Sequence, residues 1–213
     1  MIPRIHIGFV TLTRNVDMEI LAMMTYLAST RNYAFTVEFS QGCYICQNRN
    51  NIARSFMVNK DTDWLFFWDV DVVVRDREFF DKLIETSEKF DAKVVAGVYR
   101  LKGLDHLYPV TGDDGKNIKL GELKEPRLVQ SAATGLMMIH REVIEKIPPP
   151  WFQVTNLPEG GVWPEDFNFC RLAREAGFKV AVDPRFETFH VKEVLKKHSM
   201  DITMEDFNKY HVG

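Results

Sequence analysis

The most constraining feature of this chain is an unbroken apolar run, residues 64–68, that ends at two aspartates, Asp69 and Asp71. Such a run predicts a strand buried inside a sheet. Open α/β sheets bind their ligands at the carboxyl ends of their strands, so both carboxylates are expected at a binding edge. Their oxygens suit Mg²⁺ or Mn²⁺, which keeps positions open for substrate phosphates. The pair alone is a weak signal, because aspartates also cap helices and fill turns.

Strand-like and helix-like segments alternate through the first hundred residues. Strands are expected at 4–12, 33–39, 63–70 and 92–99, and helices at about 17–29, 47–60 and 77–90. Either Asn15 or Asp17 is suited to cap the first helix. This order predicts an α/β fold, with a central mainly parallel sheet flanked by helices on both faces.

The pattern changes after residue 101. Glycines, prolines and a turn signal in 102–126 predict a hairpin or an excursion over the sheet edge. A strand at 128–139 and a short helix at 141–146 are expected next. Residues 151–163 are predicted to form an irregular loop that acts as a lid. A helix at 164–176, with proline at its first position, and a last strand at 178–182 complete the series.

Composition limits the function classes. With 213 residues and 46% apolar residues, the chain predicts one globular domain over 1–190 and a carboxy-terminal tail over 191–213. A net charge of −3 argues against nucleic acid as the main partner. Three cysteines make a disulfide framework improbable. No signal peptide is recognisable, and no apolar run approaches the ~20 residues of a transmembrane helix, so we expect a cytoplasmic protein.

Four stretches stand in a suggestive order: 49–53 (RNNIA), 62–71 (TDWLFFWDVD), 134–143 (TGLMMIHREV) and 163–177 (WPEDFNFCRLAREAG), followed by His190. Together they closely resemble the GT-A fold (Rossmann-like) glycosyltransferases, particularly the family-two-like enzymes that use nucleotide-sugar donors. The resemblance covers residues 4 to about 190. It implies a UDP- or GDP-sugar donor and a glycan, lipid-linked or protein acceptor.

The resemblance also implies a metal site. Asp71 would bind Mn²⁺ or Mg²⁺, Asp69 would lie beside the ion or the donor ribose, and His190 would complete the metal shell. A divalent cation there would neutralise the charge that grows on the leaving nucleotide diphosphate. The alternative for His190 is a surface histidine at the end of a strand.

Glu165 and Asp166 match the acidic pair that such families place at a helix start. In the inverting enzymes the aspartate is the general base that deprotonates the acceptor hydroxyl. The resemblance therefore implies Asp166 as base, with Glu165 beside it. Acids in the first helical turn also stabilise the helix dipole by ~0.3–1 kcal/mol without any catalytic role.

Further residues are expected at the donor. The end of the first strand opens onto the same edge, and the pair Arg49 and Asn50 resembles one that faces the donor in such families. Arg49 could instead pair with an acid on the helix surface. The candidate donor-binding residues are Thr11, Thr13, Arg14, Arg49, Asn50, Asp69, Tyr99, Arg100 and Gly135.

The chain departs from the family pattern in one respect. It lacks the Gln-x-x-Arg-Trp motif of processive enzymes, so transfer of single sugars is expected rather than polymerisation. Two alternatives remain. A sugar-nucleotide nucleotidyltransferase would need a glycine-rich loop after the first strand, and residues 11–15 contain no glycine. The other is a catalytically inactive carbohydrate-binding relative.

Overall fold

The computed structural model describes residues 2–11, 16–42, 44–100, 107–119, 121–157 and 160–190. Its centre is a seven-stranded sheet in the order β2-β1-β3-β10-β5-β13-β8. Five strands run in one direction: β1 (Arg4–Thr11), β2 (Ala34–Gln41), β3 (Trp64–Asp69), β5 (Val94–Gly97) and β13 (Val180–Asp183). Two run against them, β8 (Arg127–Leu128) and β10 (Leu136–His140). The predicted mainly parallel sheet is confirmed.

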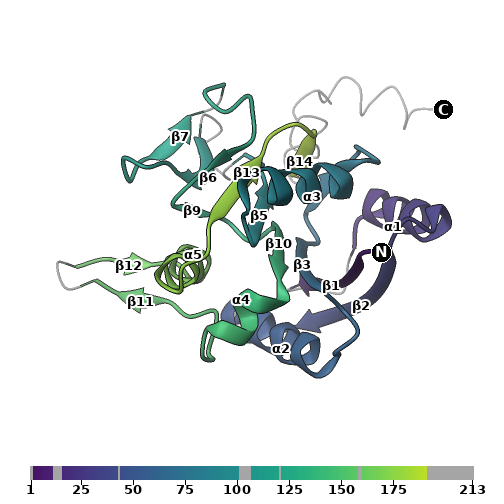
Figure 1. Cartoon of the computed structure of the whole chain (residues 1–213), viewed down its shortest axis with the longest axis horizontal. Coiled ribbons are helices and arrows are strands. Elements are labelled where there is room, and N and C mark those ends of the chain that lie inside the picture. The colour runs from purple at the N-terminus through teal and green to yellow at the C-terminus, as the bar shows by residue number, and fades with distance from the viewer. Residues whose placement is uncertain are drawn as a thin grey trace, which may run out of the picture.

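Helices cover both faces of this sheet, as predicted (Figure 1). Side chains alternate along β3, so Leu65 and Phe67 pack on one face while Phe66 and Trp68 pack on the other. Helices α2 (Ile45–Val58), α4 (Arg141–Lys146) and α5 (Glu165–Glu175) cover the first face. Helices α1 (Met18–Thr30) and α3 (Phe79–Phe90) cover the second. No helix in the described ranges is both long and apolar enough to cross a membrane.

The helix ends follow their local sequence. Asp17 caps α1, and its side chain accepts a hydrogen bond from the backbone N–H of Glu19 at 2.8 Å. Pro164 is the N-cap of α5 rather than its first helical residue, a shift of one position from the prediction. Gly177, just past the end of α5, has a φ of 95°, which favours glycine.

The predicted strand at 128–139 is wrong as a single element. Instead the chain forms β8, then β9 (Ser131–Ala132), then β10, and each piece pairs with a different partner. β9 joins a three-stranded sheet with β6 (Leu107–Thr111) and β7 (Asn117–Lys119), which confirms a hairpin within 102–126. Each change of partner breaks the strand, and hydrophobic alternation along the chain carries no signal for such a change.

Two further pairings were not predicted. β4 (Val72–Val74) pairs antiparallel with β14 (Thr188–His190) directly after the two aspartates. β11 (Thr155–Asn156) pairs with β12 (Val162–Trp163), so the expected irregular loop at 151–163 contains a hairpin. Strands of two or three residues are too short to show a period of two, which is why the sequence pattern missed them.

Candidate active site

A buried arginine is the centre of the candidate site. The side chain of Arg49, on α2, is only 3% exposed. Its Nη1 donates a hydrogen bond to Oε1 of Glu165 on α5, and its Nη2 lies 3.5 Å from Oδ1 of Asp69 at the end of β3. The alternative of a surface ion pair for Arg49 is therefore wrong. One guanidinium joins three elements at the carboxyl edge of the sheet.

Gly135, which precedes β10, and Tyr99, which follows β5, lie next to Asp69. The N–H of Asp69 donates to the carbonyl oxygen of Gly135 at 2.9 Å, and the N–H of Gly135 donates to the Tyr99 hydroxyl at 3.1 Å. A Cβ atom at Gly135 would lie 2.4 Å from the Tyr99 oxygen and 3.0 Å from Oδ2 of Asp69. Glycine is required here because the side chains approach the backbone so closely.

Burial and charge shift the titration of these groups. Burial raises the pKa of Asp69, and so do Asp71 and Glu165, against the opposing effect of Arg49. Burial, then the charge of Glu165, raises the pKa of Asp166 to about 6. Burial also raises the pKa of Tyr99 well above its usual value, so its hydroxyl stays protonated. The carboxylates in this cluster outnumber the one arginine, an imbalance that a bound cation would reduce.

Asp166 occupies the first turn of α5, beside Glu165. Its Oδ1 accepts a hydrogen bond from the N–H of Phe167 at 2.8 Å, which fixes the carboxylate on the helix. The negative charge of Asp166 raises the pKa values of both Arg49 and Tyr99, so it belongs to the same electrostatic cluster. The two members of the acidic pair thus differ, since Glu165 hydrogen-bonds to Arg49 and Asp166 has a pKa raised chiefly by burial.

Asn50 points to a different neighbour. Its Nδ2 donates to the carbonyl oxygen of Phe152 at 2.7 Å, and its Oδ1 accepts from the N–H of Phe152 at 3.2 Å. Nδ2 also donates to the carbonyl oxygen of Cys46 at 2.8 Å. Both ends of this amide therefore hold the segment before β11, which gives Asn50 a structural position next to Arg49.

Of the expected metal ligands, Asp69 ends β3 and Asp71 follows it. Asp71 is half-buried between β3 and β4, and the backbone of His190 pairs with Val72, the residue after Asp71. The side chain of His190 lies outside the described residues. No group of three or more His, Cys, Asp or Glu side chains within the described ranges is placed to hold a metal ion. Two carboxylates nevertheless fit Mg²⁺ or Mn²⁺, which binds through one or two such groups plus substrate phosphates.

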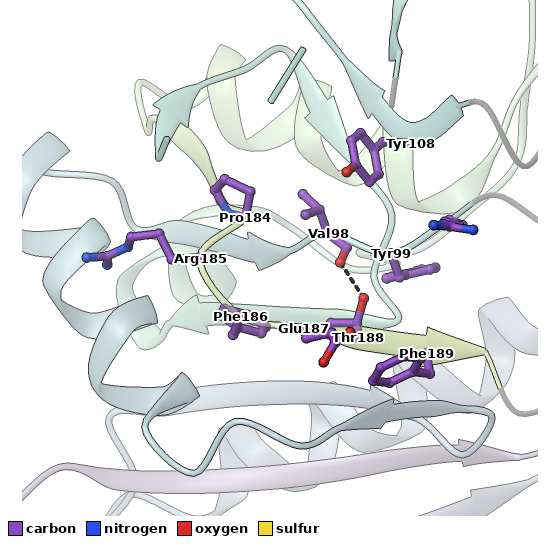
Figure 2. Close-up of a pocket in the computed structure, with 10 residues that line it drawn as sticks. Val98, Tyr99, Tyr108, Pro184, Arg185, Phe186, Glu187, Thr188 and Phe189 are labelled. Carbon is purple, nitrogen blue, oxygen red and sulfur yellow. Dashed lines mark hydrogen bonds between the residues drawn. The ribbon is translucent and has the colours of Figure 1, made fainter. Parts of the chain in front are cut away.

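Of the remaining donor candidates, the structure describes Thr11, Tyr99 and Arg100. Thr11 is buried at the end of β1, next to Val10, which pairs with Asp69 in β3. Thr13 and Arg14 lie outside the described residues. Tyr99 and the exposed Arg100 line a pocket of about 430 Å³. Figure 2 shows residues 184–189 along one side of this pocket and Tyr108 on the other, and the Thr188 hydroxyl donates to the carbonyl oxygen of Val98 at 2.7 Å.

Comparison with known proteins agrees with this architecture. No protein-family model and no curated protein sequence matches the chain. Comparison with solved structures shows that the sheet and its flanking helices form a GT-A-like fold. The structure of A197 from STIV matches with a TM-score of 0.63 and 22% identity, covering 88% of this chain and 85% of that one.

Two more matches extend the likeness. GalNAc-T7, solved with UDP, GalNAc and Mn²⁺, has a TM-score of 0.52 and 13% identity, over 89% of this chain and 44% of that chain. TarS 1–349 from S. aureus has a TM-score of 0.50 and 11% identity, over 97% of this chain and 68% of that one. The present chain therefore spans less than half of the GalNAc-T7 chain. At these identities the likeness concerns the fold.

Proposed function

We propose that this protein is a metal-dependent glycosyltransferase that moves a single sugar from a nucleotide-diphosphate sugar to an acceptor hydroxyl. The observation that carries the proposal is the bridge from Arg49 to Asp69 and Glu165. It brings the aspartate that ends β3 and the acidic pair that begins α5 to one edge of a GT-A-like sheet. Either acid alone could have a purely structural role, such as stabilising a helix, so their meeting at one edge is what supports a catalytic role.

The donor would be a UDP- or GDP-sugar held at the ends of β1, β3 and β5. Asp69 and Asp71 would bind Mn²⁺ or Mg²⁺ together with the diphosphate, and His190 would add a third ligand. A bound cation supplies charge neutralisation on the departing nucleotide diphosphate. The structural neighbour GalNAc-T7 was solved with UDP and Mn²⁺, which supports this choice of ligands. Thr11, Thr13, Arg14 and Arg100 are the remaining proposed donor contacts.

Asp166 is the proposed general base of an inverting transfer. Its carboxylate would take the proton of the acceptor hydroxyl while the hydroxyl oxygen attacks the anomeric carbon from the face opposite the diphosphate. A base works best when its pKa lies near the working pH, and burial raises that of Asp166 to about 6. Arg49 would hold Glu165 in place by their hydrogen bond, which leaves Asp166 to receive the proton.

Transfer assays with a panel of UDP- and GDP-sugars test the base. Asp166→Asn should lower the transfer rate by about 10²–10⁴-fold, the usual cost of losing a general base. Asp61→Asn is the matched control, because Asp61 is an exposed aspartate before β3, at the opposite edge of the sheet. Proton NMR of the product anomer should show inversion. Near-normal transfer by Asp166→Asn, or a retained anomer, would exclude this mechanism.

Calorimetry tests the metal. UDP and GDP should bind the protein at least tenfold more weakly in EDTA than in Mn²⁺. A tenfold change corresponds to ~1.4 kcal/mol of binding free energy. Asp71→Asn should abolish this difference, and Asp61→Asn should preserve it. Equal affinity in EDTA and Mn²⁺ would rule out the metal role. Binding of nucleotide sugars without any transfer would favour the inactive carbohydrate-binding relative.

A further inference from the structure

A second pocket, of about 340 Å³, lies against the outer surface of α5. Its lining comes from the β6–β7 hairpin, residues 130–131, the β11–β12 hairpin and α5. Figure 1 shows the two hairpins on different sides of α5. Asp69, Asp71, Tyr99 and Arg49 are not part of its lining. This α5 pocket is therefore distinct from the acidic cluster described above.

The α5 pocket combines two aromatic side chains, Trp163 and Phe167, and two arginines, Arg171 and Arg174, with neutral polar groups. Trp163 supplies the indole, Asn117 and Gln130 supply amides, and Thr111 and Ser131 supply hydroxyls. Among its lining residues there is no carboxylate. An indole offers a flat apolar face, and amides and hydroxyls both donate and accept hydrogen bonds. A sugar ring presents the complement, an apolar C–H face with hydroxyl groups around its rim.

The indole of Trp163 is held in place. Its backbone pairs with Thr155 across the β11–β12 hairpin, and the guanidinium carbon of Arg171 lies 5.5 Å from the ring centroid. Arg171 is itself fixed, because Nη2 donates to Oδ1 of Asn168 at 2.9 Å and Nη1 donates to Oε1 of Glu175 at 2.6 Å. The ring therefore meets a ligand with little further loss of side-chain freedom.

The α5 pocket adjoins the proposed base. Residues 164, 167, 171 and 174 line it, a spacing of three to four that marks one stripe along a helix. The neighbouring stripe carries Asp166 and, one and two turns later, the buried Cys170 and Ala173. Trp163 and Phe167 thus flank the helical turn that presents Asp166. Asp166 itself is not part of the lining, but a ring bound against Trp163 would lie beside the first turn of α5, which carries Asp166.

We infer that the α5 pocket is the acceptor subsite, and that it takes the sugar ring of a glycan acceptor rather than a lipid or a peptide. The ring stacks its less polar face on Trp163, and its hydroxyl groups hydrogen-bond to Asn117 and Gln130. This inference rests on the proposed glycosyltransferase function, because only a transferase needs an acceptor next to Asp166.

Binding can be measured without any turnover. The protein labelled with ¹⁵N has four indole N–H resonances, which are assigned by substituting each tryptophan in turn. Titration with methyl glycosides of glucose, galactose, mannose and glucuronic acid should shift the Trp163 resonance in at least one case. The Trp64 resonance should stay in place, since Trp64 begins β3 at the other edge of the sheet and packs on His140. No shift at Trp163 with any of these glycosides would overturn the inference.

Kinetics then connects the pocket to transfer. Trp163→Leu removes the aromatic face and should raise the KM for the responding glycoside about tenfold, as expected from loss of ring stacking. The Kd of UDP or GDP with Mn²⁺ should not change, because the donor lies elsewhere. Trp64→Leu is the matched control and should leave both quantities unchanged. An unchanged acceptor KM in Trp163→Leu would refute the subsite.

The α5 pocket and the transferase function would be refuted by different results. A Trp163 response to glycosides in a protein that binds no nucleotide would leave the pocket as a carbohydrate site and refute the transferase function. Nucleotide binding and transfer without any response of Trp163 would refute the α5 pocket alone.

Discussion

Replacing Asp166 by asparagine should make the protein more stable while it removes activity. Burial, and then the charge of Glu165, raises the pKa of Asp166 from 3.8 to about 6. At neutral pH the folded protein therefore holds an ionised carboxylate that its buried position destabilises relative to the unfolded state. One pKa unit corresponds to ~1.4 kcal/mol, so a rise of about two units predicts a gain of about 2–3 kcal/mol in the free energy of unfolding for Asp166→Asn. The asparagine Oδ1 can still accept the hydrogen bond from Phe167.

The sign of the pH dependence follows from this raised pKa. Between 3.8 and about 6 the folded state binds more protons at Asp166 than the unfolded state does. The wild-type protein therefore loses stability as the pH rises through this window, whereas the asparagine variant has no such contribution. The difference between the two proteins should be complete above pH 6 and vanish below 3.8.

Urea unfolding at pH 7.5, 6.0 and 4.5 in EDTA measures this difference. Asp61→Asn, which changes an exposed carboxylate, should match the wild type at every pH. A variant less stable than the wild type at pH 7.5, or a gain that does not change with pH, would refute the burial argument. The same pKa predicts that the transfer rate of the wild type rises with pH and levels off above about 6.

Two further predictions concern the packing around the site. Gly135→Ala should lower the free energy of unfolding by about 1–3 kcal/mol, because its Cβ would lie 2.4 Å from the Tyr99 oxygen. Tyr99→Leu in the same chain should recover part of this loss, and strictly additive effects in urea unfolding would contradict the clash. Arg185→Met should cost about 3–5 kcal/mol in thermal unfolding, because it leaves the fully buried Asp183 without its cation. Arg75→Met breaks an exposed ion pair and should cost less than about 1 kcal/mol, so equal losses in the two variants would argue against burial as the cause.

Much of the fold could be predicted because its signals are local. Apolar or alternating segments identified the five strands that run in one direction, and Asp17 was one of two candidate caps for α1. The antiparallel strand β10 lies between β3 and β5, and no pattern within residues 136–140 reveals these partners. β4, β11, β12 and β14 were missed because two or three residues are too few to show a period.

In the candidate site, too, some features have local sequence signals and others depend on contacts between distant residues. Asp69, Glu165 and Asp166 could be proposed from sequence because acids at a strand end and a helix start are visible there. The ion pair between Arg49 and Glu165 spans 116 positions, so only the folded chain reveals it. The place of Asn50 at the donor stays a prediction, and its hydrogen bond to Phe152, 102 positions away, is likewise visible only in the folded chain. Neighbours in a helix can serve different partners, and sequence spacing alone does not separate them.

The position of β10 has a consequence for how the protein reaches its native state. β3 and β5 end at residues 69 and 97, yet they are joined through a strand that begins at residue 136. A nascent chain that has passed residue 97 therefore holds two strands whose inner edges await a partner still to be synthesised. Unpaired edges invite association between chains, and contacts between distant residues slow folding. A chain interrupted before residue 136 should therefore aggregate, whereas one that includes β10 can close its sheet.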